Sequence, residues 1–183
     1  STIDGTGITI DEAAAAIVDT LHHPDEEVVW EDDTPQDAEK IALSLHSKYC
    51  QIIAPKQTYR GVEIACERLE ITDLGIALTG TTDRVRETAD GLAICDLKTG
   101  KAAVGADGLV KTAGHAFQMG VYELLAEQAG GMPITGAAQI IGMNTAKTPA
   151  SQRVGTGEIA GAREVLLGDG ESPGILEHAA RII

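Results

Sequence analysis

One stretch constrains the fold more than any other: residues 76–95, where a β-branched segment, a tight turn and an apolar run follow one another. Residues 76–88 include four threonines, an isoleucine and a valine, which favour an extended strand. Asp90-Gly91 is a turn signal. The run from Leu92 to Cys95 is typical of a strand that is buried on both faces. The sequence therefore predicts an antiparallel hairpin.

Three charged residues fall where this hairpin brings its strands together. Asp96 and Lys98 are two residues apart, so both side chains point to the same face of a strand. Asp83 lies thirteen residues before Asp96, and a turn near Asp90 places it across from residues close to Asp96. Two adjacent carboxylates repel one another unless a cation lies between them, and their oxygens suit Mg²⁺ or Mn²⁺.

In such a site Lys98 can orient or deprotonate a water molecule, or neutralise charge that develops on a phosphate. The alternative interpretation is that Asp83-Arg84 and Asp96-x-Lys98 are ordinary exposed ion pairs, which contribute little to stability.

A helix is predicted after the hairpin, from about residue 109 to residue 128, with Gly130-Gly131 ending it. Its expected buried stripe consists of Leu109, Ala113, Phe117, Val121, Leu124 and Leu125. A polar stripe has helical spacing on another face and consists of Lys111, His115, Gln118 and Tyr122. These polar side chains either line a groove that holds phosphate groups or simply face water.

These motifs together resemble a known family. Gly80-x-x-Asp83, Asp96-Leu97-Lys98-Thr99-Gly100 and Gln118-x-x-x-Tyr122 are similar to the PD-(D/E)XK nuclease superfamily. The pattern is closest to the RecB-like branch, which includes the nuclease of CRISPR spacer acquisition and many phage exonucleases. The match covers roughly residues 60–145, about half of the chain. It implies an α/β fold with a restriction-endonuclease-like core, in which a mixed central sheet in αβββαβ order is flanked by helices.

The resemblance also implies roles for individual residues. Asp83 and Asp96 would hold Mg²⁺ or Mn²⁺ together with the backbone carbonyl of Leu97, and Lys98 would activate or position the attacking water. Glu63 would complete the metal shell, with Glu67 and Glu70 as rivals.

On the helix, Gln118 and Tyr122 would orient the site or the DNA. Asp11 stands roughly where the family often carries a histidine that joins the metal site, although an N-cap role is the simpler interpretation.

The implied activity is that of a metal-dependent DNA exonuclease in phage or bacterial recombination, repair or replication. A flap or junction endonuclease would use the same residues, and a non-catalytic recombination partner that keeps the fold is a third alternative. The expected partners are DNA, a recombination or single-strand annealing protein, and copies of the same chain. The net charge of −14 argues against nucleic-acid binding, because affinity for the backbone comes from basic residues. A local basic stripe can still steer DNA.

The cysteines and the hydropathy pattern bear on location. Cys50, Cys66 and Cys95 are dispersed and odd in number, which suits the reducing cytoplasm of a bacterium or a phage-infected cell. Some RecB-like relatives hold an iron–sulfur cluster on cysteines near the C-terminus, but none follows Cys95, so we expect no cluster in this chain. We expect no membrane span and no signal peptide.

The length of 183 residues predicts a single nuclease domain with a core at about 59–145. Helices are expected over 11–22 and 34–53 before the core, and over 158–167 and 172–183 after it. Further strands are expected over 59–72 and 135–145. Val28, Val29 and Trp30 would anchor an acidic loop, and residues 147–157 would form a flexible loop whose Lys147 and Arg153 either contact DNA phosphate or move freely.

Overall fold

The structure, a computed structural model, describes residues 7–31 and 33–181. The chain folds into two compact units. Unit 1 comprises Ser1–Gln57, Lys98–Lys111 and Gly142–Thr156, and unit 2 comprises Thr58–Leu97, Thr112–Ile141 and Gly157–Ile183.

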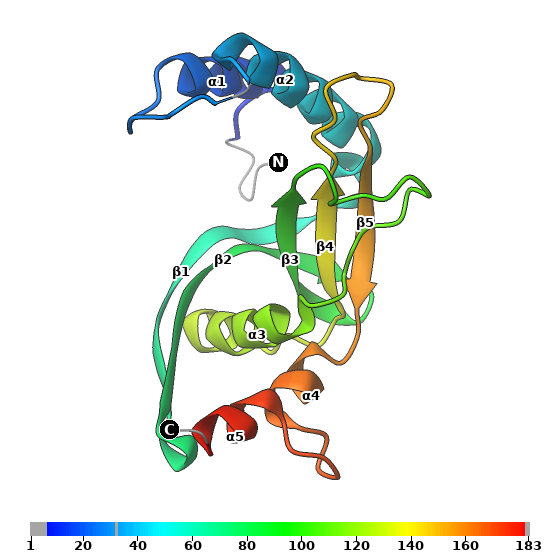
Figure 1. The fold of residues 1–183 in the computed structure, drawn as a ribbon. Coiled ribbons are helices and arrows are strands. Elements are labelled where there is room, and N and C mark those ends of the chain that lie inside the picture. The colour runs from blue at the N-terminus through cyan, green and yellow to red at the C-terminus, as the bar shows by residue number, and fades with distance from the viewer. Residues whose placement is uncertain (1–6, 32, 182–183) are drawn as a thin grey trace. The chain divides into compact units, whose positions relative to one another are not determined.

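The strands form a single sheet in the order β1-β2-β3-β4-β5. Their bounds are β1 Tyr59–Ile71, β2 Ile76–Thr88, β3 Gly91–Thr99, β4 Ala138–Met143 and β5 Val154–Ile159. Strands β1, β2 and β3 are antiparallel neighbours, whereas β4 points the same way as β3 and β5 points the opposite way (Figure 1). The sheet is therefore mixed, as predicted.

The helices flank this sheet in the sequence order ααβββαββαα, which contains the predicted αβββαβ core. Their bounds are α1 Ile10–His22, α2 Pro35–Ile52, α3 Ala116–Gly130, α4 Ala162–Leu167 and α5 Ile175–Ala180, with short 3₁₀ turns at Ala54–Lys56 and Thr72–Leu74. Within the described residues, no helix has the length and apolar character needed to cross a bilayer.

In unit 2, β1 and β2 form a long curved ribbon, and α3 lies along its inner side (Figure 1). Leu78 of β2, Leu125 of α3, Leu166 of α4 and Leu176 of α5 are buried together at the centre of this packing. Helix α4 approaches α3 closely at Gly120, where a Cβ atom would lie 2.5 Å from the carbonyl oxygen of Ala162. The absence of a side chain at this position thus allows the two helices to touch.

The predicted hairpin is confirmed at both of its ends. Strand β2 covers the predicted residues, and the ladder with β3 runs from Arg84 opposite Cys95 to Thr88 opposite Gly91. The hydroxyl of Thr88 donates to the carbonyl of Gly91 at 2.8 Å and closes the turn. Gly91 has a φ of 117°, a region that disfavours side chains.

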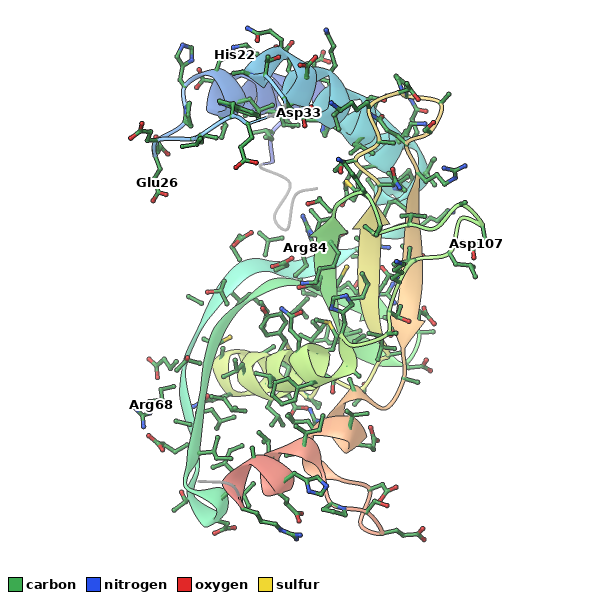
Figure 2. All side chains as sticks on the ribbon, in the orientation of Figure 1. His22, Glu26, Asp33, Arg68, Arg84 and Asp107 are labelled. Atoms are coloured by element: carbon green, nitrogen blue, oxygen red, sulfur yellow. The ribbon has the colours of Figure 1, made fainter. Side chains whose placement is uncertain are left out.

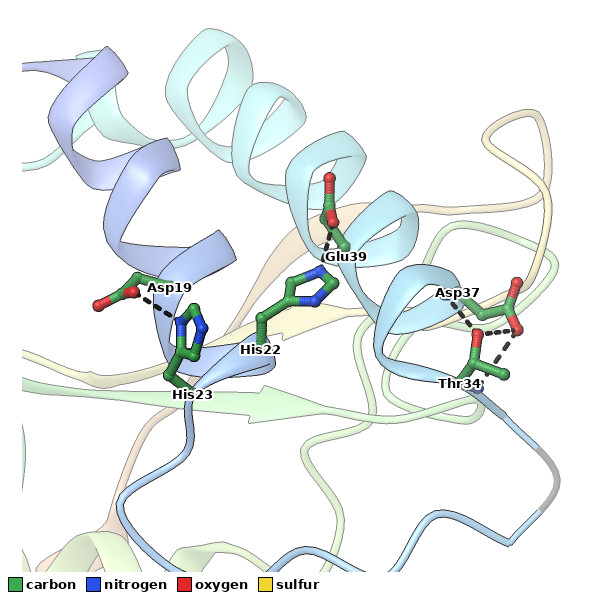
Figure 3. A network of polar contacts seen from close by, with 6 residues as sticks. All are labelled: Asp19, His22, His23, Thr34, Asp37 and Glu39. Carbon is green, nitrogen blue, oxygen red and sulfur yellow. Dashed lines mark hydrogen bonds and ion pairs between the residues drawn. The ribbon is translucent and has the colours of Figure 1, made fainter.

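In unit 1, helices α1 and α2 form a hairpin of their own (Figure 3). The Nε2 atom of His22 lies 2.7 Å from the carboxylate of Glu39 and links the two helices. Thr34 caps α2, with its hydroxyl accepting from the Asp37 amide. Helix α1 is capped by Thr9, so the proposed N-cap role of Asp11 is wrong: Asp11 lies in the first turn. A carboxylate there is favoured by the helix dipole.

Other predicted elements need correction. Residues 154–159, expected partly as loop and partly as helix, form strand β5, and α4 begins only at Ala162. The final helix is short, and residues 182–183 of its predicted range lie outside the described residues. Val28, Val29 and Trp30 are exposed, so they do not anchor the acidic loop.

Helix α3 begins seven residues later than predicted, at Ala116 rather than Leu109. Gly114, with a φ of 87°, turns the chain just before the helix and breaks the expected register. As a result Leu109 and Phe117, predicted as buried, are 69% and 40% exposed. The residues of α3 that are actually buried are Met119, Gly120, Glu123, Leu125 and Ala126.

Candidate active site

The register of the hairpin sets Asp83 and Asp96 opposite one another. The last paired residues are Arg84 and Cys95, and one further step along the antiparallel strands brings the two aspartates face to face. The Asp83 carboxylate accepts a hydrogen bond from the amide of Leu97 at 2.9 Å. This bond crosses from β3 to β2 and fixes the Asp83 side chain against the strand that carries Asp96.

Burial of β3 explains why Asp96 lies inside the protein. The three residues before it, Ala93, Ile94 and Cys95, are fully buried, and the Asp96 side chain is 2% exposed. Burial also raises the pKa of the Cys95 thiol to about 11. The thiol therefore stays neutral near pH 7 and acts as a small apolar side chain, not as a nucleophile.

Lys98 is the second residue after Asp96 in the same strand. Side chains alternate along a strand, so Lys98 and Asp96 leave β3 on the same face. The order of acid, acid and lysine predicted from the sequence is thus retained in the hairpin.

The chemistry of the two carboxylates fits a hard divalent cation. Asp83 and Asp96 supply oxygen ligands of the kind that Mg²⁺ and Mn²⁺ prefer, and a backbone carbonyl such as that of Leu97 is a ligand of the same class. Over residues 7–31 and 33–181, however, no three side chains of the His, Cys, Asp and Glu types gather as metal ligands. A metal role for the carboxylate pair therefore stays a prediction.

Glu63, the predicted third ligand, lies on β1 between the pairs Val62–Arg84 and Ile64–Thr82, and so stands opposite Asp83 in the ladder. Its side chain is exposed. Glu63 has a φ of 49°, the only positive φ among the described residues other than glycine. Such a backbone costs about 1–2 kcal/mol, and strain of this kind occurs often at functional sites.

Its rivals on β1, Glu67 and Glu70, are also exposed. The metal role of Glu63 stays a prediction.

The amide of Gln118 donates to the hydroxyl of Tyr122 at 2.9 Å along one side of α3. A Cβ atom at Gly80 would lie 3.5 Å from the Tyr122 ring, so the ring packs onto β2 at this glycine. Gly80 and Asp83 are three residues apart, and strand alternation sends their substituents to opposite faces. The Gln118–Tyr122 pair therefore supports the backbone of β2 and does not share a face with Asp83.

The predicted four-residue polar stripe is only partly correct. Lys111 lies before α3, in unit 1, and His115 is the N-cap residue of α3 without a side-chain capping bond. The late start of the helix removes both from the helical face of Gln118 and Tyr122.

Two further charged residues, the half-buried Arg84 and the buried Glu123, were not identified from the sequence. The guanidinium carbon of Arg84, which Figure 2 labels, lies 5.6 Å from the centre of the Tyr59 ring in a cation–π contact. Glu123 on α3 is 6% exposed, and its carboxylate lies 3.7 Å from the guanidinium of Arg163 on α4.

Burial raises the pKa of the Glu123 carboxyl to about 7, and the Arg163 charge opposes this shift. One feature of the sequence points to the burial of Glu123. It lies three residues after Gly120 and therefore on the same side of α3, the side that α4 covers.

Comparison with known proteins identifies the family and a similar fold. The model of a family described as the PD-(D/E)XK nuclease superfamily matches residues 7–175. A crystal structure of a candidate exonuclease from Eubacterium rectale superposes with a TM-score of 0.54 at 13% sequence identity, over 96% of this chain and 66% of that one. This chain thus spans 66% of that protein's length, and at this identity the likeness concerns the fold alone. No curated protein matches the chain.

Proposed function

Because the chain belongs to the PD-(D/E)XK nuclease superfamily, we propose that it is a metal-dependent DNA exonuclease that hydrolyses phosphodiester bonds. The observation that supports this proposal is the hydrogen bond from the Leu97 amide to Asp83, beside a ladder that ends at Arg84–Cys95 and whose continuation by one step sets Asp83 opposite Asp96. A buried carboxylate opposite a second carboxylate calls for a cation. The proposed setting is phage or bacterial recombination, repair or replication in the cytoplasm.

In this proposal Asp83, Asp96 and the Leu97 carbonyl bind Mg²⁺ or Mn²⁺, and Glu63 completes the shell. Such an ion, when bound, polarises a phosphate and lowers the pKa of a coordinated water. Lys98 orients the attacking water and stabilises the negative charge that develops on the phosphate. The water oxygen bonds to phosphorus, the bond to the leaving oxygen breaks, and the proton lost by the water ends on that oxygen.

Gln118 and Tyr122 act indirectly, as positioning residues. The Tyr122 ring contacts β2 at Gly80, and Gln118 donates a hydrogen bond to the Tyr122 hydroxyl.

The experiment is digestion of end-labelled linear DNA beside a covalently closed circle, with Mg²⁺ or Mn²⁺ and with a chelator as control. We expect the linear DNA alone to be degraded, and Lys98→Ala to reduce the rate by at least about 10²-fold. Lys40→Ala, an exposed lysine on α2, is the matched control and should retain full activity.

Cleavage of the circle would instead indicate an endonuclease of the same superfamily. Absence of cleavage with both metals would reject the proposed activity and favour a non-catalytic recombination partner. Normal activity in Lys98→Ala would reject the role of Lys98.

A further inference from the structure

A second candidate site lies in unit 1, in a pocket of about 600 Å³ between the segments 101–111 and 144–153. Six of its eleven lining residues carry polar or charged side chains: Lys101, Lys111, Asn144, Lys147, Ser151 and Arg153. None of these residues belongs to the carboxylate pair on β2 and β3. A pocket of this volume is large enough for a nucleotide-sized ligand.

The charge of this lining is opposite to that of the protein. Acidic residues outnumber lysine and arginine two to one in the sequence, 28 against 14, yet the pocket is lined by four cations and by no acid. Nearly a third of the basic residues of a strongly acidic chain thus converge on one pocket. Because like charges repel, this grouping is costly unless an anion binds between them.

Acidic side chains near the pocket offset part of this charge, and Asp33 and Asp37 both act on Lys147. Asp33 lies 2.7 Å from the Lys147 ammonium and balances that one cation. Asp107, at the tip of the loop after β3 (Figure 2), directs a carboxylate oxygen to the Leu109 amide at 3.0 Å. The positive charges of Lys101, Lys111 and Arg153 remain to attract an anion.

The pocket wall is held by hydrogen bonds to backbone carbonyls that do not involve the lysine side chains. The side-chain amide of Asn144 donates through Nδ2 to the carbonyl of Lys101 at 2.7 Å and to that of Val104 at 3.2 Å. The Lys111 amide donates to the carbonyl of Ala103 at 3.2 Å. The side chains of Lys101 and Lys111 can therefore be removed without breaking the loop that carries them.

Lys101 follows Lys98 by three residues, and both belong to unit 1. The chain that leaves the proposed catalytic lysine thus runs directly into the wall of the basic pocket. A strand of nucleic acid is the polyanion that the proposed reaction supplies, since each of its residues carries a phosphate.

We propose that this pocket binds phosphate groups of a nucleic-acid strand and supplies the affinity for DNA that the acidic surface cannot. The proposal rests on the nuclease function proposed above and names where the substrate backbone is held. The contacts are with phosphate oxygens, so the site binds different base sequences equally well.

The test is binding, not cleavage. We would measure the anisotropy of a fluorescent single-stranded oligonucleotide in EDTA, over a range of salt concentrations. Lys101→Ser/Lys111→Ser is compared with Lys40→Ser/Lys56→Ser, which removes two exposed lysines of the same unit outside the pocket. We expect the pocket variant to bind at least about ten-fold more weakly, with the salt slope reduced by roughly 1 per lysine. The control variant should stay within two-fold of the wild type, by our order-of-magnitude estimate.

Oligonucleotides with a 5′-phosphate and with a 5′-hydroxyl locate the phosphate that is held. If the pocket variant loses affinity equally for both oligonucleotides, the pocket binds internal phosphates. If it loses affinity only for the oligonucleotide with a 5′-phosphate, the pocket binds a strand end. Both results support the site. Equal binding by the two double variants, or no binding by the wild type at low salt, overturns it. DNA binding without cleavage by the wild type would reject the nuclease function while leaving the pocket supported.

Discussion

Asp96 on β3 and Glu123 on α3 are both buried carboxylates of unit 2, with 2% and 6% of their surfaces exposed, but they face opposite kinds of neighbour. Glu123 lies 3.7 Å from the guanidinium of Arg163, which also contacts Glu127 at 2.9 Å. Asp96 stands opposite a second carboxylate, that of Asp83. The buried acid beside an arginine joins two helices, whereas the buried acid opposite another acid is the one that we propose as a metal ligand.

The comparison is tested most strongly by Asp96→Asn. This change should lower DNA cleavage by at least about 10³-fold, because one of the two carboxylates that we propose as metal ligands is lost, while removal of a charge that repels Asp83 should leave the stability equal or higher. Single-turnover cleavage and chemical denaturation measure the two effects. If the variant lost stability together with activity, Asp96 would have a structural role like that of Glu123.

Arg163→Met should have the opposite profile, losing stability and keeping activity. It leaves Glu123 buried without its cation, which costs about 3 kcal/mol at pH 8. The loss should be smaller at pH 5, where Glu123 is protonated. Arg181→Met, which removes an exposed arginine, is the control and should change the unfolding free energy by less than about 0.5 kcal/mol. Equal effects of the two substitutions would show that Arg163 does not stabilise Glu123.

Glu123→Gln should change how stability depends on pH. Burial raises the pKa of this carboxyl from 4.5 to about 7, so the folded protein holds the proton more tightly than the unfolded chain does. The stability that this group contributes is therefore complete below pH 4.5 and is lost as the pH rises through 7, by about 3 kcal/mol in total. The glutamine variant should lack this decline between pH 5 and pH 8.

Urea denaturation at the two pH values checks this prediction. The control is Glu171→Gln, which replaces an exposed glutamate. Its stability should fall between pH 5 and pH 8 as that of the wild type does. A decline of the same size in Glu123→Gln would mean that another group titrates.

The smallest effect is expected from Gly120→Ala, which tests the helix contact that holds Arg163 near Glu123. The new Cβ atom would lie 2.5 Å from the Ala162 carbonyl oxygen and 2.9 Å from the Leu166 Cβ, so α4 must shift, at a cost of about 2 kcal/mol. Gly130→Ala, at the other end of α3, meets no atom within 4 Å and should be neutral or slightly stabilising. Thermal denaturation compares the two, and equal melting temperatures would mean that α4 adapts without strain.

The carboxylate pair could be predicted from the sequence because every signal for it is local. The threonine-rich strand, the Asp90-Gly91 turn and the apolar run fix the hairpin, and strand alternation then sets the register of Asp83 and Asp96. The wrong start of α3 has a local cause as well: Gly114 adopts a left-handed φ that outweighs the helical pattern before it.

The features that could not be predicted depend on contacts between distant segments. Strand β5 contains two glycines in six residues, and pairing with β4, not propensity, makes it a strand. Glu123 depends on Arg163, forty residues further along the chain. The basic pocket collects its cations from segments more than thirty residues apart, so no spacing in the sequence indicates it.

The turn between β2 and β3 constrains how this protein can change in evolution. Only Ala89 and Asp90 separate the two strands. A single inserted or deleted codon at this place would move Asp96 to the opposite face of the sheet; a deletion would bring Leu97 into its position, and an insertion would bring Cys95 there. Substitutions in the turn preserve the register, whereas changes in its length do not. Active homologous proteins should therefore differ freely in the residues of this turn but keep the thirteen-residue interval between the two aspartates.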